Sequence, residues 1–352
     1  MSDSLFEEGG PHRIRRTGGD HYEMSVSLPP DEDGMLAREC EVDACSPAYF
    51  KVRPGTGITE GQAVMYCPYC RTASDPSHFH TREQIRYAQD LAKDEALKGV
   101  DRMVQKALGL GSSPRKKLVD GLISVELEYT PGQRPMVRRP LEEELRRDIR
   151  CRHCGLDHAV FGLAIWCPDC GRDVFIQHVE AEFASVSKML EELPTRRERL
   201  GHRVAARDLE NSLEDVVSIF EAVLKIITRR NLQTAGKSSD QIEEVVRRNV
   251  RNSYQNVASA ENTYRDLVGA ELFGGISQQE KEHLSAIFEK RHPITHNLGV
   301  VDRRYLDRAR SGELEGREVR VTGPEVAKAI ELSLLVLGSA YRARFPFDGS
   351  LR

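Results

Sequence analysis

The chain has 352 residues, of which 39% are hydrophobic and 30% charged, and its formal net charge is −4 at pH 7. This length suits two or three domains. The near balance of charge excludes a global field that attracts nucleic acid, so any polyanion site must be a local patch. There is no apolar run of about 18 residues to span a membrane and no apolar core of a secretory signal. We therefore expect a cytoplasmic protein, in which paired cysteines indicate metal rather than disulfides.

The N-terminal half is expected to hold little regular structure outside its cysteine groups. Residues 1–34 are rich in Gly, Pro, Asp and Glu and are expected to be disordered. A helix is predicted from Thr81 to about Leu108, with Thr81 as its N-cap. Apolar and polar residues alternate in part from Leu122 to Tyr129, which predicts a half-buried strand.

All eight cysteines fall into two groups of four. The second group contains two Cys-x2-Cys pairs separated by twelve residues, and Gly155 and Gly171 directly follow these pairs. Two such knuckles place four thiolates at the corners of a tetrahedron, which suits zinc. The first group has a looser Cys-x4-Cys pair, twenty-one residues and a Cys-x2-Cys pair, and His78 or His80 could replace a weak ligand. The preferred ligands are Cys40, Cys45, Cys67, Cys70, Cys151, Cys154, Cys167 and Cys170.

These sites predict two structural zinc ions per chain. A closed four-thiolate site keeps no open coordination position, so we expect no metal cofactor in catalysis.

Arginines cluster before and within the second group, and they could bind phosphate. A solvated surface neutralised by residues 142–144 and Asp148 is the simpler interpretation. The arginines considered for nucleic-acid binding are Arg138, Arg139, Arg146 and Arg147.

About five helices are predicted beyond residue 178. Apolar residues recur there at helical spacing, and Ser277 with Glu280 forms a capping box. The last helix is apolar on nearly all sides from Ile330 to Leu337, so it should be central or lie at a subunit interface. The predicted helices are Val179–Leu193 (ended by Pro194), Ala205–Arg230, Ser239–Glu271, one from Ser277 and one from Thr322.

The fourth helix leads into residues 291–299, Arg-His-Pro-Ile-Thr-His-Asn-Leu-Gly. Arg291 follows Ile287 and Phe288 at helical spacing, so it should face inward, where a guanidinium needs an anion or a polar cleft. Pro293 should bend the chain and bring His296 near. Histidine transfers protons near neutral pH, and arginine holds a phosphate at two points. The pair therefore suits RNA cleavage.

This segment resembles the hallmark of the HEPN superfamily, all-helical domains of which many are metal-independent RNases of toxin–antitoxin, CRISPR and phage-defence systems. The hallmark is Arg, four to six residues, then His, which Arg291 and His296 match, and the trailing His-Asn-x-Gly is similar to many HEPN motifs. The resemblance covers roughly residues 178–345. It implies attack by a ribose 2′-hydroxyl on the adjacent phosphate, which gives a 2′,3′-cyclic phosphate and a 5′-hydroxyl. It also implies a homodimer in which both motifs face one cleft.

His292, Asn297 and Glu221 are weaker supporting candidates. Successive helical residues point about 100° apart, so Arg291 and His292 should not both face inward if the helix continues. Other Arg–His pairs share the spacing but lie in the N-terminal segment or beside the cysteines. The one serious competitor is Arg197–His202, in a polar linker between predicted helices.

The predicted fold class is α+β, with two small four-cysteine zinc ribbons followed by an all-α HEPN-like bundle. The expected boundaries are 35–110 for the first ribbon and its helix, 118–178 for the second ribbon, and 179–346 for the helical domain. The expected function is a metal-independent endoribonuclease, as a phage-defence or toxin effector, whose ribbons recognise a target or partner. RNA and a second copy are the expected partners, and a protein trigger or antitoxin is open. The alternatives are a non-catalytic zinc-ribbon protein that binds nucleic acid or protein and dimerises through its helices, and a transcription-associated factor that binds duplex DNA.

Overall fold

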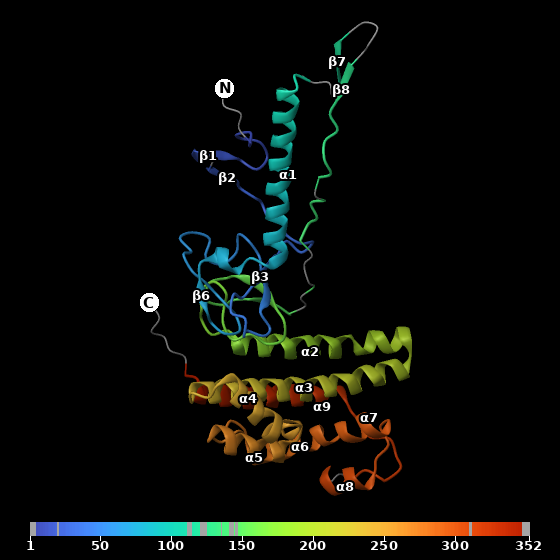
Figure 1. Cartoon of the computed structure of the whole chain (residues 1–352). Coiled ribbons are helices and arrows are strands. Elements are labelled where there is room, and N and C mark those ends of the chain that lie inside the picture. Colours follow the sequence, from blue (N-terminus) through green and yellow to red (C-terminus); the bar gives the residue numbers. More distant parts are fainter. Residues whose placement is uncertain are drawn as a thin grey trace. The chain divides into compact units, whose positions relative to one another are not determined.

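The structure is a computed structural model that describes residues 5–19, 21–110, 115–119, 125–134, 136–140, 144, 147–309 and 312–346. The chain divides into two compact units (Figure 1). Residues 1–161 and 166–172 form what we call the cysteine unit, which holds the strands and both cysteine groups. Residues 162–165 and 173–352 form the helical unit. The predicted combination of a cysteine-bearing sheet region and a helical C-terminal part is confirmed.

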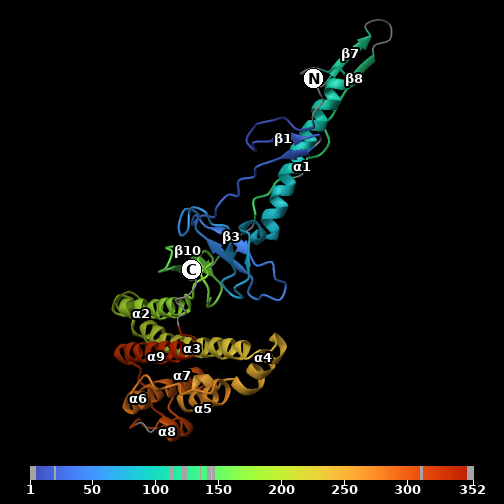
Figure 2. The same ribbon diagram turned by 90° about the vertical axis from the view of Figure 1, so that its left-hand side faces the viewer.

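A four-stranded antiparallel sheet is the centre of the cysteine unit, with the order β3-β4-β10-β9. Its outer strands are β3 (Leu36–Glu39) and β9 (Arg147–Arg150), and its inner strands are β4 (Tyr49–Val52) and β10 (Asp157–Val160). The inner strands pair with Ala159 opposite Lys51. The two cysteine groups, for which we expected separate ribbons, therefore share one sheet (Figure 2).

Three two-stranded sheets complete the strands described for this unit. One of them, β1–β2, lies within residues 1–34, for which we expected disorder, and Arg15 donates a 2.7 Å hydrogen bond to Glu23 across it. The predicted strand at 122–129 corresponds to β8, although its first residues lie outside the described part of the chain. The strands are β1 (Arg15–Gly18), β2 (His21–Glu23), β5 (Met65–Tyr66), β6 (Ala73–Ser74), β7 (Arg115–Val119) and β8 (Val125–Glu128).

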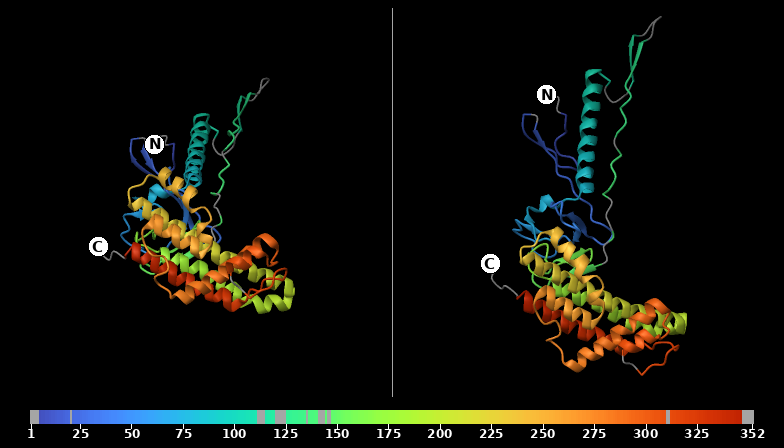
Figure 3. Two further views of the ribbon diagram at one scale, coloured as in Figure 1. Left: turned by 90° about the horizontal axis from the view of Figure 1, so that it is seen from below. Right: turned by 60° about the horizontal axis from the view of Figure 1, so that its bottom comes forward.

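The longest helix of the cysteine unit is α1 (Arg82–Ala107), shown in cyan in Figure 3. It follows a short 3-10 helix, η1 (Pro76–Phe79). The predicted cap is confirmed: Thr81 Oγ1 accepts from the Gln84 amide, and Gln84 Oε1 accepts from the Thr81 amide, each at 3.2 Å. Gln84 is buried and also donates from Nε2 to the Ala37 carbonyl at 3.0 Å. This side chain therefore fixes the start of α1 on β3.

The core of the helical unit is built from three long helices, α2 (Phe175–Leu200), α3 (His202–Thr234) and α9 (Gly323–Arg344), which pack on one another (Figures 1 and 2). The last helix, α9, is buried along most of its length and is central to the unit, one of the two places expected for it. The predicted end of the first helix at Pro194 is wrong, because α2 continues for six more residues. Pro194 is exposed and lies inside α2 without ending it, although its ring removes one backbone hydrogen bond. No helix in the described ranges is long and apolar enough to cross a membrane.

The single helix predicted at 239–271 is also wrong. It is divided into α4 (Ser239–Val245), a π-helical turn η2 (Val246–Val250), a 3-10 turn η3 (Ser253–Gln255) and α5 (Val257–Val268). Two contacts enforce the break. Buried Tyr254 shares a 2.6 Å hydrogen bond with Thr228 on α3, and Asn256 Oδ1 caps α5 by accepting from the Ser259 amide at 3.0 Å. These tertiary and capping contacts outweigh the apolar stripe.

Three shorter helices complete this unit: α6 (Gln278–Glu289), α7 (Arg291–Asn297) and α8 (Arg303–Ala309). The capping box predicted at Ser277 is confirmed, and Thr322, the predicted start of the last helix, forms a second one. Pro293 has no N–H to donate to the carbonyl four residues earlier, which explains the break between α6 and α7 at Lys290. The helix α8 was not predicted from the sequence.

Candidate functional site

The first cysteine cluster has the geometry of a tetrahedral metal site. Its four thiol groups lie within 4.8 Å of one another, with Cys40 and Cys70 Sγ atoms 3.6 Å apart and Cys45 and Cys67 Sγ atoms also 3.6 Å apart. A disulfide needs sulfurs about 2.05 Å apart. A zinc ion with Zn–S bonds of about 2.3 Å instead sets ligand sulfurs roughly 3.8 Å apart. The observed distances therefore fit a metal.

The second cluster repeats this geometry. Its Sγ–Sγ distances are 3.8 Å between Cys151 and Cys170 and 3.5 Å between Cys154 and Cys167. His78, considered as a replacement ligand for the first cluster, instead shares a 2.8 Å hydrogen bond with Ser74. The preferred sets of four cysteines are thus the ones that come together.

The two Cys-Pro-x-Cys knuckles bind each other directly. The Tyr66 amide donates to the Pro168 carbonyl at 2.7 Å, and the Trp166 amide donates to the Pro68 carbonyl at 3.0 Å. Arg71, at a positive φ of 64°, stacks its guanidinium 4.2 Å from the Trp166 ring centre. Backbone pairing and this stacking join both clusters into one module.

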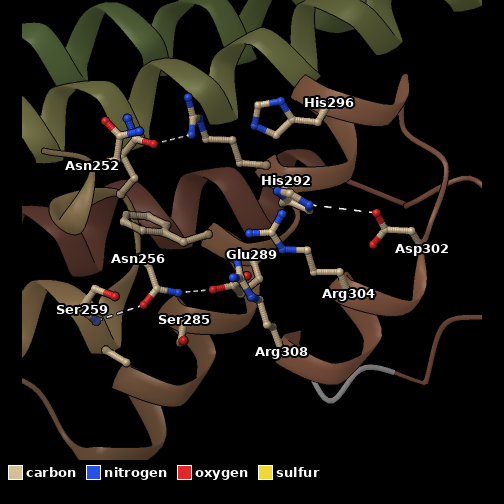
Figure 4. Close-up of a pocket in the computed structure, with 14 residues that line it drawn as sticks. Asn252, Asn256, Ser259, Ser285, Glu289, His292, His296, Asp302, Arg304 and Arg308 are labelled. Carbon is tan, nitrogen blue, oxygen red and sulfur yellow. Dashed lines mark hydrogen bonds and ion pairs between the residues drawn. The ribbon is translucent and has the colours of Figure 1, made fainter.

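A pocket of about 890 Å³ in the helical unit contains the predicted Arg–His pair (Figure 4). Side chains from the break before α5 and from α5, α6, α7 and α8 line it. Three arginines and two histidines line the pocket, whereas Glu289 and Asp302 are its two carboxylates. The nitrogen-bearing groups are Arg291, His292, His296, Arg304 and Arg308.

Arg291 is held by a chain of polar contacts that reaches the middle of α3. Its Nη1 donates to Gln255 Oε1 at 2.9 Å, and Gln255 Nε2 donates to Glu221 Oε2 at 2.7 Å. Lys225 donates to the other oxygen of Glu221 at 2.5 Å. Arginine only donates and carboxylate only accepts, so the chemistry fixes which way the Gln255 amide lies. Glu221, one of the weaker supporting candidates, is thus connected to Arg291 by way of the Gln255 side chain.

The guanidinium of Arg291 has unused hydrogen-bonding capacity. Its Nε is buried and has no hydrogen-bond partner among the residues described, and the partner of its Nη1 is a neutral amide. A buried donor without an acceptor is costly. An anion in the pocket would balance the positive charge of this guanidinium.

Both imidazoles of α7 line the pocket, with ring centres 5.1 Å apart. His292 Nε2 lies 4.0 Å from Asp302 Oδ2, and His296 is exposed. Burial and the nearby charge of Arg304 lower the pKa of His292, while Asp302 acts in the opposite direction. Burial and the charge of Arg304 thus favour the neutral imidazole of His292.

The pocket extends around the start of α7, so two successive residues of this helix line it. Arg291 and His292 were not expected to face inward together, yet both line the pocket, Arg291 toward Gln255 and His292 toward Asp302. Thr295 fastens the same helix to α3 through a 2.8 Å hydrogen bond to Glu214. Arg291 and His292 thus project from a helix that is hydrogen-bonded to α3.

Other predicted residues lie elsewhere. Asn297 donates from Nδ2 to the Val300 carbonyl at 2.8 Å, so its amide closes the turn after α7, and it does not line the pocket. The competing pair is in contact, since Arg197 Nε donates to His202 Nδ1 at 3.1 Å, but both residues are exposed and lie outside the pocket.

The arginines of the cysteine unit remain on its surface. Arg138 and Arg139 lie in a stretch without helix or strand, Arg147 lies on β9, and all three are exposed. Arg146 lies outside the described residues. Their exposure is compatible with both interpretations, a solvated surface and a phosphate-binding patch.

Sequence reasoning missed most of the pocket lining, including Gln255, Asn256, Arg304 and Arg308. The sequence contains an N-cap residue for two of the helices at the pocket, α5 and α8. Asn256 stands three residues before Ser259 as an N-cap, and Asp302 Oδ1 caps α8 by accepting from the Tyr305 amide at 2.7 Å. No local signal connects Gln255 with Arg291.

Comparisons with known proteins add no constraint to this geometry. No protein-family model, curated protein or solved structure matches the chain. The two cysteine clusters and the pocket are therefore the features from which a function can be inferred.

Proposed function

We propose that the helical unit is a metal-independent endoribonuclease that resembles the HEPN superfamily. The observation that carries this proposal is the convergence of Arg291, His292 and His296 in one pocket, with a buried Arg291 Nε that lacks an acceptor among the described residues. A phosphodiester group supplies the anion that this arginine needs. The two imidazoles supply proton transfer beside it.

The proposed reaction is a transesterification within the RNA strand. The ribose 2′-oxygen forms a bond to phosphorus while the bond from phosphorus to the 5′-oxygen breaks, which gives a 2′,3′-cyclic phosphate and a 5′-hydroxyl. One proton leaves the 2′-hydroxyl and one reaches the 5′-oxygen. His296 carries one of these transfers, and His292, beside Asp302, is available for the other. Arg291 holds the phosphate and balances the charge that develops on it.

The pocket offers little to a divalent cation. In the described part of the chain, the groups of three or more potential ligands that come together are the two cysteine clusters, and the pocket is not among them. Its arginines would also repel a cation. We propose that Cys40, Cys45, Cys67 and Cys70 hold one zinc ion and that the second cluster holds another. Zinc there stabilises the fold.

His296→Ala tests the enzymatic proposal. Purified parent protein should cleave RNA in the presence of EDTA and leave cyclic-phosphate ends, which mass spectrometry detects. The variant should lose activity by about 10²- to 10⁴-fold because it lacks the proton-transferring group. Arg291→Lys should also lose activity, since lysine keeps the charge but lacks the planar two-point grip.

The matched control is His202→Ala, because His202 also lies beside an arginine but outside the pocket. It should cleave like the parent. An essential His202 with a dispensable His296 would mean that the other pair is catalytic. Equal cleavage by all variants, or none by the parent, would replace the enzymatic proposal with the non-catalytic binding protein. Dimerisation, which the resemblance implies, is checked by the mass of the protein in solution.

A further inference from the structure

Two arginines on α8 have no role in the chemistry proposed above. Arg304 and Arg308 are four residues apart, so they share one face of the helix, and both line the pocket that holds Arg291. Figure 4 shows the two side chains on the side of the pocket near His292 and Glu289. Their position places two further positive charges beside the proposed reacting phosphate.

Neither arginine has a partner of opposite charge among the described residues. Within that part of the chain, Arg304 and Arg308 form no ion pair or hydrogen bond, although Arg303 on the same helix pairs with Asp307 at 3.7 Å. Other arginines of this unit are paired as well, such as Arg230 with Asp173 at 2.7 Å. The two pocket arginines therefore differ from these paired ones in keeping their charge uncompensated.

The two carboxylates of the pocket are already engaged. Glu289 is buried and accepts a hydrogen bond from Asn256. Asp302 caps α8 through the Tyr305 amide and faces His292. Since neither carboxylate pairs with an arginine in the described ranges, the charge of Arg304 and Arg308 remains available for an anion from solution. Both arginines also lower the pKa of His292, after burial and together with His296, which agrees with a positive field in the pocket.

We propose that Arg304 and Arg308 form a second phosphate-binding site, which holds an RNA phosphate adjacent to the one held by Arg291. This inference rests on the proposed ribonuclease function. A pocket of about 890 Å³ has the size that encloses a small ligand. An unpaired nucleotide can enter it and a duplex cannot, so the substrate class is single-stranded RNA with at least two consecutive phosphates.

Binding to RNA that cannot be cleaved tests the site apart from catalysis. The probe is a fluorescent 2′-O-methyl oligoribonucleotide, which lacks the attacking hydroxyl, and anisotropy is measured over a series of salt concentrations. The double variant Arg304→Gln/Arg308→Gln should raise the Kd by about ten- to a hundredfold, as expected when hydrogen bonds to a charged group are removed. The slope of log affinity against log salt should fall by about 0.7 for each phosphate that the protein no longer neutralises.

Two further variants control for charge and folding. Arg303→Gln removes a charge from the same helix outside the pocket and should change neither the Kd nor the slope. Arg304→Lys/Arg308→Lys keeps both charges, so it should retain the salt slope while it weakens binding because lysine lacks the planar grip. If the double glutamine variant unfolds, the lysine variant still tests the site: parental affinity would overturn the proposal.

Cleavage of short substrates supplies an independent measurement. For the parent, a phosphate added to one end of a dinucleotide should lower the KM about tenfold or more with little change in kcat. The double glutamine variant should not respond to that phosphate, whereas Arg303→Gln should respond like the parent.

The outcomes separate the two proposals. If the parent cleaves RNA and the double glutamine variant has unchanged Kd, salt slope and KM, the second phosphate site is refuted. The ribonuclease function then remains in place. A parent that does not cleave, with a variant that loses affinity and slope, refutes the ribonuclease function and supports the phosphate site. If the parent neither binds nor cleaves RNA, both proposals are wrong.

Discussion

Gln255→Leu removes the side chain that connects Glu221 to Arg291, with little change in size. The variant leaves Arg291 Nη1 without its acceptor at 2.9 Å and Glu221 Oε2 without its donor at 2.7 Å. A hydrogen bond to a charged group contributes about 1.5–3 kcal/mol. If that contribution serves to hold the guanidinium for the transition state, kcat/KM should fall by about 10- to 150-fold, since each tenfold change corresponds to about 1.36 kcal/mol.

The assay is steady-state cleavage of a short RNA, with thermal unfolding measured on the same samples. Gln278→Leu is the matched control, because Gln278 also donates to a carboxylate, that of Glu282 at 2.9 Å, on the exposed start of α6. The control should keep the parental kcat/KM. If Gln255→Leu folds and cleaves like the parent, Gln255 does not position Arg291 for catalysis. If it loses only thermal stability, the polar chain has a structural role alone.

The remaining predictions concern the metal and the charge of His292. Elemental analysis of the intact protein should find two zinc ions per chain, and the double variant Cys167→Ser/Cys170→Ser should retain one. A single ion or none in the parent would contradict the paired clusters. Arg304→Gln should raise the pKa of His292, because it removes a positive charge that disfavours the imidazolium; its protonated fraction then persists to higher pH. NMR titration of the imidazole resonances checks this shift, and a pKa that stays the same or falls would contradict it.

Features encoded by adjacent residues were predictable from the sequence. The caps at Thr81, Ser277 and Thr322 each need a residue only three positions away, and the structure contains all three. The cysteine sets also followed from short spacings, because the ligand knuckles are local. Local chemistry of this kind is visible in one sequence.

Features that depend on distant contacts were not predictable. Gln255 stands 36 residues before Arg291, and it reaches the pocket because the Tyr254–Thr228 contact helps break the expected helix. The seven-residue α8 that carries Arg304 is too short to show a helical period. The pairing of β4 with β10 joins segments about a hundred residues apart, so the common sheet of the cysteine groups had no local signal either.

That common sheet would link the two proposed zinc sites thermodynamically. Free energy of metal binding is also free energy of folding when the apo ligands are not held in place. The first ion to bind orders the β4–β10 pair and the mutually bonded knuckles, and these same elements carry the ligands of the other cluster. The second ion then meets a preformed cage and binds more tightly. We therefore expect the intact cysteine unit to load zinc cooperatively, so that parent chains with one ion are scarce, and the Cys167→Ser/Cys170→Ser variant should hold its single ion less tightly than the parent.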